Sequence, residues 1–245
     1  MFGYNLDKKY LYILLAVLVI INLRSITVDG ILQLCLTLPA VIIAITFHEY
    51  AHAYAADKLG DDTPRYQGRL NLNPLSHIDP VGFVLLVFVG IGWGKPVEIN
   101  PRNFKRDVST QKGEAIVSIA GPLANFILAI VSGILLEIVY IYGNKMFLIS
   151  TAGRIILILL TELVAINIGL GVFNLIPLPP LDGSKIFMSI IPYKARTWLI
   201  NNSNIFYIIF LVLWITGLAG EIVAPIIQLI YNGLMYGIGA IFKLF

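Results

Sequence analysis

Long apolar stretches separated by short polar connections run along almost the whole chain. Because a helix needs about 20 apolar residues to cross a bilayer, this pattern predicts about six transmembrane helices. Their predicted ranges are Tyr10–Val28, Ile31–Ala56, Ala115–Tyr142, Ile155–Asn174, Ile205–Leu218 and Ile222–Phe242. The pattern therefore indicates an all-α polytopic membrane protein.

One further apolar stretch, Val81–Trp93, is too short to cross a membrane. It lies between the second and third predicted spans and is bounded by Asp79-Pro80 and by Gly94-Lys95-Pro96. We interpret it as a re-entrant or interfacial segment. The alternation at Val97 and Ile99 predicts a short β-element directly after it.

The composition excludes a large soluble domain. Of the 245 residues, 58% are hydrophobic and 13% are charged, whereas soluble domains carry about a quarter charged residues. This apolar composition predicts the lipid bilayer as a partner, and the net charge of +3 is too small to indicate a nucleic-acid partner. The single cysteine, Cys35, excludes an intrachain disulfide and a cysteine-based zinc cluster.

The basic residues predict the orientation, because cytoplasmic loops of membrane proteins are enriched in Lys and Arg. With the N-terminus inside and six alternating spans, all but three of the 17 Lys and Arg residues lie inside; the exceptions are Arg24, Lys145 and Arg154. Both termini are therefore expected in the cytoplasm. Residues 57–114 must then stay on the inner side, which independently favours a re-entrant Val81–Trp93.

The second predicted span contains a His-Glu-x-x-His pattern. His48 and His52 are four residues apart, so both imidazoles leave the same face of a helix and can hold one Zn²⁺. Glu49 between them can act on a water at the metal. A catalytic zinc site needs a third protein ligand.

Several residues in or beside the spans could be that ligand. Asp182 stands out because Pro177, Pro179 and Pro180 precede it and prevent a continuous helix, and unwound backbone at membrane depth is tolerated where it lines a cavity or packs in protein. A turn-capping role is the alternative for Asp182. The other candidates are Glu137, Glu162, Glu221 and His77.

Together these motifs resemble the site-2 protease family of intramembrane zinc metalloproteases, and in particular its compact bacterial members. The resemblance rests on segments 48–52 (HEYAH) and 174–183 (NLIPLPPLDG), in that order. Segments 73–82 (NPLSHIDPVG), 95–103 (KPVEINPRN) and 121–125 (GPLAN) extend it. We therefore expect a single membrane-embedded domain over 1–245, with a core at 31–191, peripheral helices at 1–30 and 200–245, and no appended soluble domain.

The resemblance implies an endopeptidase that hydrolyses transmembrane or membrane-anchored protein substrates near the cytoplasmic side of a bacterial cell membrane. It implies one zinc per chain, bound by His48, His52 and Asp182, with Glu49 as the general base. Asn174 is expected to contact the substrate or the developing oxyanion. A structural role is favoured for His77, Asn73 and Asn125.

Two other functions remain as alternatives: a proteolytically silent helix-binding protein, and a transporter that handles zinc as cargo. A transporter is expected to show inverted repeats, and no repeat is evident here. Retention of Glu49 argues against a silent protein, because metal binding alone does not need it. Gly233 and Gly237 form a small-x-x-x-small pair that we assign to internal packing, with a homo-oligomer contact as the weaker alternative.

Overall fold

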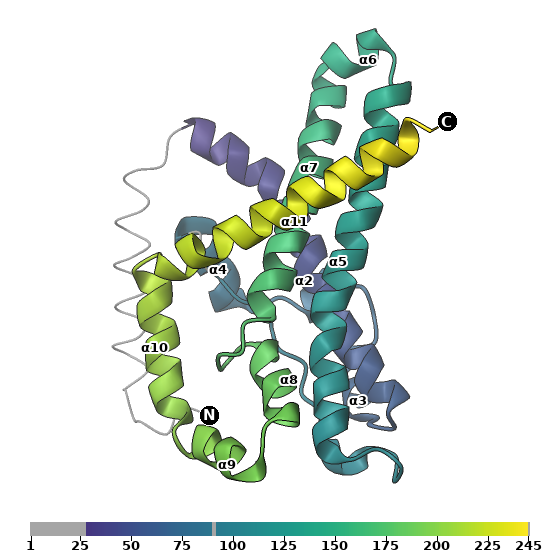
Figure 1. Cartoon of the computed structure of the whole chain (residues 1–245). Coiled ribbons are helices and arrows are strands. Elements are labelled where there is room, and N and C mark those ends of the chain that lie inside the picture. The colour runs from purple at the N-terminus through teal and green to yellow at the C-terminus, as the bar shows by residue number, and fades with distance from the viewer. Residues whose placement is uncertain (1–27, 90–91, 245) are drawn as a thin grey trace.

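The computed structural model describes residues 28–89 and 92–244. All regular elements in these ranges are helices (Figure 1), so the all-α prediction is confirmed for the described part of the chain. The elements are α2 (Val28–Lys58), α3 (Thr63–Tyr66), η1 (Pro74–Ser76), α4 (Pro80–Val89), η2 (Pro101–Asn103), α5 (Thr110–Tyr142), α6 (Lys145–Ile149), α7 (Thr151–Asn174), α8 (Asp182–Ile190), α9 (Tyr193–Asn201), α10 (Ser203–Ile215) and α11 (Leu218–Phe242).

Four described helices are long and apolar enough to cross a membrane. They are Gln33–Lys58 within α2, and α5, α7 and α11. The predicted Ile205–Leu218 span corresponds to α10, which qualifies only together with α9 as a pair bent by 66°. The predicted span Tyr10–Val28 lies outside the described residues. Four to five spans in the described ranges are consistent with a multi-pass membrane protein.

The centre of the fold is formed by α2, α5 and α7, which pack against one another. Small buried residues line these contacts, and they let helix backbones approach closely where water cannot drive association. They include Ala40, Ala44, Ala53, Gly121 and Ala129. Helix α11 crosses in front of α5 and α7 (Figure 1), with Val223 packed against Val164, Ile168 and Val172.

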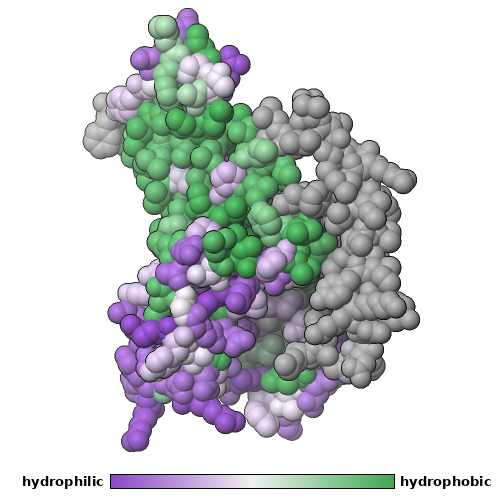
Figure 2. All heavy atoms as spheres, turned by 180° about the vertical axis from the view of Figure 1, so that it is seen from behind, coloured by the Kyte–Doolittle hydropathy of each residue, from purple (hydrophilic) through white to green (hydrophobic). Residues whose placement is uncertain are grey.

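The surface shows where the apolar band lies. Figure 2 shows hydrophilic side chains gathered at the lower end of the molecule and hydrophobic side chains over most of the upper part. The lower end carries α3, α9 and the start of α5 (Figure 1). This distribution matches a membrane protein with one large polar face.

The predicted re-entrant segment contains a short helix, α4, rather than a span. Its two ends meet, because Ile78 and Gly94 form an antiparallel bridge and the Lys95 amide donates to His77 O at 2.8 Å. Neighbouring ends are what a re-entrant segment requires. The position of this segment in the membrane stays a prediction.

The predicted β-element is wrong for the described residues, which contain this single bridge and no strand. Pro96 has no N–H to continue a ladder. The next available amides bond elsewhere: Val97 N donates to Glu49 Oε2 at 3.0 Å, and Asn100 N donates to Asp61 Oδ2 at 2.6 Å. Side-chain acceptors therefore replace a partner strand.

Helix α11 carries the two glycines assigned to internal packing. No described atom other than the helix's own backbone lies within 4 Å of a Cβ built at Gly233 or Gly237. The prediction that these glycines serve internal packing is therefore wrong for the part of the chain that the structure describes. A homo-oligomer contact at this face stays a prediction.

Candidate metal centre

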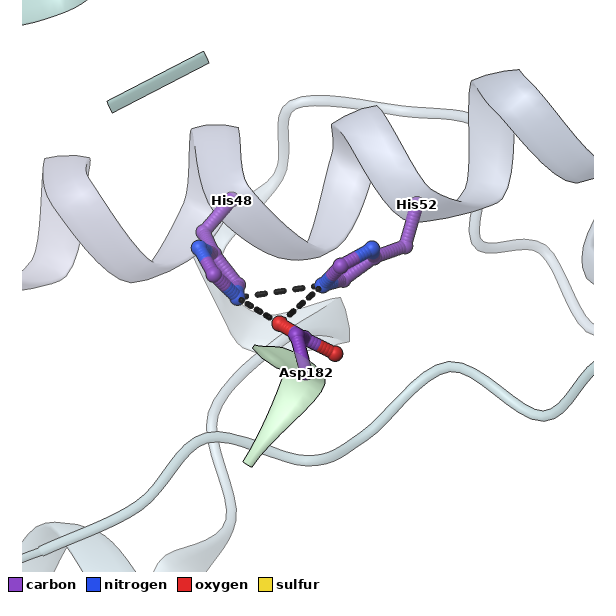
Figure 3. A group of neighbouring side chains, drawn as sticks. All are labelled: His48, His52 and Asp182. Atoms are coloured by element: carbon purple, nitrogen blue, oxygen red, sulfur yellow. Dashed lines mark hydrogen bonds and ion pairs between the residues drawn. The ribbon is translucent and has the colours of Figure 1, made fainter. Parts of the chain in front are cut away.

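His48 and His52 leave one face of α2 and lie opposite Asp182, the first residue of α8 (Figure 3). The two Nε2 atoms are 3.0 Å apart, and each lies 3.1 Å from Asp182 Oδ2. Both histidines are buried, at 5% and 8% exposure. A stretch of 134 residues separates His48 from Asp182 in the chain, so the fold itself assembles this group.

The other ring nitrogens of both histidines are already engaged. His48 Nδ1 lies 2.6 Å from Asn125 Oδ1, and His52 Nδ1 lies 2.7 Å from Val117 O. A carbonyl oxygen only accepts, so each Nδ1 must carry the hydrogen. In the neutral rings this leaves both Nε2 atoms as acceptors facing Asp182.

A chain of buried amides fixes this assignment. Asn125 Nδ2 donates to Ala44 O at 3.1 Å and to Asn167 Oδ1 at 2.8 Å, and Asn167 Nδ2 donates to Leu163 O at 2.8 Å. Both asparagines are fully buried. The amide of Asn125 therefore cannot flip without losing both donor contacts, and its oxygen stays on His48.

These residues fit a divalent metal ion. Three acceptors directed at one point repel one another unless a positive charge lies between them, and a metal ion satisfies all three at once whereas a proton links only two. Two imidazoles and one carboxylate are a known donor set of catalytic zinc, with the fourth position open. Tetrahedral bonds of that kind separate ligand atoms by about 3.3 Å, close to the distances here.

Gly121 makes room for the imidazoles where α5 crosses α2. A Cβ at this position would lie 2.5 Å from His52 Nε2 and 2.7 Å from His48 Cε1. Any side chain would therefore displace the rings. The glycine of the GPLAN segment is thus explained by the close approach of α5 to the cluster.

Gly183 has a similar role beside Asp182. A Cβ there would lie 2.3 Å from Leu175 O and 2.4 Å from Ile176 O, so α8 can begin against the end of α7 only with glycine. The residue at the N-cap position of α8 is Leu181, with no side-chain cap hydrogen bond. The turn-capping alternative for Asp182 is therefore wrong, since its carboxylate faces the histidines.

Glu49 lies next to the cluster but is not part of it. Its Oε2 accepts the Val97 N–H at 3.0 Å and lies 3.9 Å from Arg69 Nη2. Burial lowers the pKa of the Arg69 guanidinium, and the carboxylate of Glu49 opposes this shift. Glu49 is thus held by the loop that follows α4.

The remaining sequence candidates lie outside the cluster. Asn174 Nδ2 donates to Leu170 O at 3.0 Å within its own helix, so its predicted contact with a substrate stays a prediction. His77 is fully buried and its Nε2 lies 2.7 Å from Asn71 O, which confirms a structural role; burial also lowers its pKa. Asn73 caps η1 by accepting from Leu75 N. The other residues outside the cluster are Glu137, Glu162 and Glu221.

Sequence reasoning missed the residues that support the cluster. For Asn125 the sequence favours packing or satisfaction of backbone groups, with a direct role as the weaker alternative, and it singles out neither Asn167 nor Arg69. A signal existed, because amides inside a membrane span are costly unless they find partners. Two asparagines in neighbouring spans could have been paired on that ground.

Comparisons with known proteins agree with this geometry. The model of peptidase family M50 matches residues 36–216. The chain is 37% identical over 203 residues to "Putative zinc metalloprotease YwhC" of Bacillus subtilis, covering 83% of this chain and 90% of that protein. It is 25% identical over 212 residues to "Putative zinc metalloprotease MJ0611" of Methanocaldococcus jannaschii, covering 85% and 96%.

A third relative matches a smaller part. "Putative zinc metalloprotease Rip2" of Mycolicibacterium smegmatis is 30% identical over 148 residues, covering 58% of this chain and 52% of that protein. No solved structure matches the chain. The extent of the family match, together with the HEYAH and LDG residues in one cluster, identifies the chain as a member of peptidase family M50, the site-2 protease family.

Proposed function

We propose that this chain is an intramembrane zinc endopeptidase that hydrolyses peptide bonds in transmembrane or membrane-anchored proteins. The observation that carries the proposal is the cluster of His48, His52 and Asp182 beside Glu49, with both histidines buried on a helix long and apolar enough to span a membrane. One zinc ion per chain is proposed, because the donor set suits it. The cluster residues are largely shielded from solvent, and in such a setting hydrolysis needs a group that supplies activated water and stabilises charge.

The chemistry divides between the metal and the protein. A metal ion bound at the cluster would acidify a water and polarise the scissile carbonyl. Glu49 takes the proton of the attacking water and returns it to the leaving amine. Asn125 and Val117 O keep both histidines in the tautomer that offers Nε2.

Substrate contacts are proposed for two further elements. Asn174 would turn its amide from Leu170 O toward the developing oxyanion, as a donor of the kind that stabilises such charge. The backbone of Glu98 and Ile99 would pair with an unwound substrate, since an exposed edge can accept an added strand. No backbone hydrogen bond among the described residues joins Glu98 or Ile99 to another segment.

The proposed setting is a multi-pass protein of the bacterial cell membrane, with about six spans in a single domain over 1–245. Both termini and residues 57–114 would be cytoplasmic, which follows from the charge bias of the loops. The polar lower end in Figure 2 supports an aqueous setting for that end of the molecule, and the charge bias alone assigns it to the cytoplasm. The substrate would reach the cluster from the same side.

The substitution Glu49→Gln tests the function. With a membrane substrate, cleavage is expected to fall by about 10²–10⁴-fold, while zinc stays near one per chain by metal analysis. Glu137→Gln is the control, because Glu137 is a span carboxylate outside the cluster. Undiminished cleavage by Glu49→Gln would refute the base assignment.

The third ligand needs its own measurement. Asp182→Ala is expected to lower zinc content and cleavage together, because two imidazoles alone leave the site incomplete. Full zinc occupancy in this variant would reject Asp182 as a ligand. A silent helix-binding protein predicts no cleavage by the wild type, and a transporter predicts zinc movement across vesicles that Glu49→Gln leaves unchanged.

A further inference from the structure

Arg69 is a buried cation in the loop between α3 and η1. Its exposed fraction is 3%, whereas arginine is almost never buried without partners. Its Nη1 donates to Ser76 O and its Nη2 donates to Lys95 O. Nε has no hydrogen-bond partner in the described ranges, so the two terminal nitrogens Nη1 and Nη2 make the hydrogen bonds of this side chain.

The two carbonyl groups that Arg69 binds lie on either side of the re-entrant segment. Ser76 ends η1 before it, and Lys95 follows directly after the Ile78–Gly94 bridge. One guanidinium therefore fastens both ends of residues 77–94. The planar fork of arginine holds two carbonyls in a fixed geometry, whereas the ammonium group of lysine donates from a single freely rotating point.

The same side chain reaches the proposed base. Arg69 Nη2 lies 3.9 Å from Glu49 Oε2, the oxygen that also accepts the Val97 N–H at 3.0 Å. Val97 is two residues beyond Lys95, the residue that Arg69 holds. Gly94 lies close to the other carboxylate oxygen, since a Cβ built there would be 3.5 Å from Glu49 Oε1.

We propose that Arg69 is a positioning residue for Glu49: by fastening the two ends of residues 77–94 it places the Val97 N–H on the Glu49 carboxylate. This inference rests on the proposed function, because it assigns Arg69 to the same reaction. In the described part of the chain, Arg69 bonds to Ser76 O and Lys95 O and pairs with Glu49, and none of its hydrogen bonds or ion pairs involves the three cluster residues. Removing it should therefore disturb the base and leave the metal ligands intact.

The test compares Arg69→Gln and Arg69→Lys in the full chain. The control is Arg65→Gln, since Arg65 lies in the neighbouring α3 with a 60% exposed side chain and pairs with Asp57. The substrate probe is a quenched-fluorescent apolar transmembrane peptide with a central Asn-Gly pair that weakens its helix. Bound zinc, kcat and KM are measured for each variant.

Arg69→Gln is expected to lower kcat by about 10–100-fold, the usual effect of losing a supporting contact at such a site. KM should stay within about threefold, and zinc should stay at the wild-type level. Arg69→Lys should fall between Arg69→Gln and the wild type. Wild-type kcat in Arg69→Gln overturns the proposal, and so does parallel loss of zinc, which would indicate a role in the metal site.

Hydrogen exchange of the Val97 amide gives a readout that needs no substrate. It should be faster in Arg69→Gln and Arg69→Lys than in the wild type, and unchanged in Arg65→Gln. Unchanged exchange in every variant overturns the proposal even if the peptide is not cleaved. If the wild type does not cleave the peptide but the Val97 amide exchanges faster in the Arg69 variants, the result counts against the proposed function and not against the positioning role of Arg69. If Arg69→Gln does not fold, both measurements are made on Arg69→Lys.

Discussion

The Nδ1 atom of His48 and the Oδ1 atom of Asn125 lie 2.6 Å apart, although 77 positions separate these residues in the chain. This contact determines which nitrogen of His48 is free. It links the α2 helix to α5, and through Asn167 to α7. The three central helices thus share one buried polar chain that ends at the cluster.

Substitution of Asn125 is expected to weaken metal binding. Asn125→Ala removes the only acceptor that the described residues offer His48 Nδ1, so the ring can move its hydrogen to Nε2 and lose its lone pair toward Asp182. The affinity for zinc should fall by about 10–100-fold. Competition with a chelator of known affinity measures it.

A matched control for this variant is Ser132→Ala. Ser132 is also a buried polar residue of α5, at 2% exposure, and it has no contact with the cluster. The Ser132→Ala variant should bind zinc with the same affinity as the wild type. Equal affinities in both variants would show that Asn125 does not orient His48.

Gly121→Ala should damage the same site by steric means. The added methyl would overlap the His52 ring, with 2.5 Å between Cβ and Nε2, so the two imidazoles cannot keep their positions. We expect loss of bound zinc by metal analysis, with the protein still recovered in detergent. The effect should be confined to the metal site, because the atoms nearest the added methyl belong to the His48 and His52 rings.

Gly237→Ala is the corresponding control. This glycine lies in α11, and among the described residues no atom outside its own helix backbone and its chain neighbours lies within 4 Å of a Cβ built there. Alanine in a helix interior is favoured over glycine by about 0.5–1 kcal/mol, so zinc content and thermal stability should not fall. Normal zinc in Gly121→Ala would contradict the close approach of α5 to α2.

Much of the fold and of the cluster could be predicted from the sequence because the signals are local. Apolar runs predict helices by length alone, and the spacing of His48 and His52 fixes a shared face. Asp182 was found through its prolines and through the resemblance. The structure then adds what sequence spacing does not contain, namely that α8 begins opposite that face.

A pairing of the buried asparagines could have been expected, but the contact of Asn125 with His48 could not be predicted, because it depends on where the helices cross. Asn125 reaches His48 only because α5 passes over α2 at Gly121. The prediction of a short β-element is wrong for a related reason. The amides of Val97 and Asn100, which a partner strand would bind, donate instead to the carboxylates of Glu49 and Asp61. Alternation at Val97 and Ile99 indicates extended backbone but not its partner.

Asp61 provides a pH-dependent stabilisation of the loop region below α2. Its carboxylate is fully buried. Burial alone would raise its pKa, but hydrogen bonds from Thr63, Asn100 and Asn103 hold the pKa below its ordinary value of 3.8. The stabilisation is therefore complete above that ordinary value, and it is lost as the pH falls through the lower pKa of the folded state.

Asp61→Asn should lower thermal stability near neutral pH, because an amide cannot accept all the hydrogen bonds that the carboxylate does. Below about pH 4 the difference from the wild type should shrink. Thermal unfolding in detergent across this range measures both. Asp62→Asn is the control, since the Asp62 side chain is 57% exposed, and a constant difference at every pH would contradict the assignment to Asp61.

The orientation in the membrane can be tested with single cysteines. Cys35 is exposed and is first replaced by alanine. A cysteine at Lys105 should then react with a membrane-impermeant thiol reagent only in inside-out vesicles, because the positive-inside bias places residues 57–114 in the cytoplasm. A cysteine at Lys145, which begins α6 at the opposite end of the molecule (Figure 1), should react only in intact cells. Labelling of the Lys105 position in intact cells would invert the topology and move the catalytic loops to the outer side.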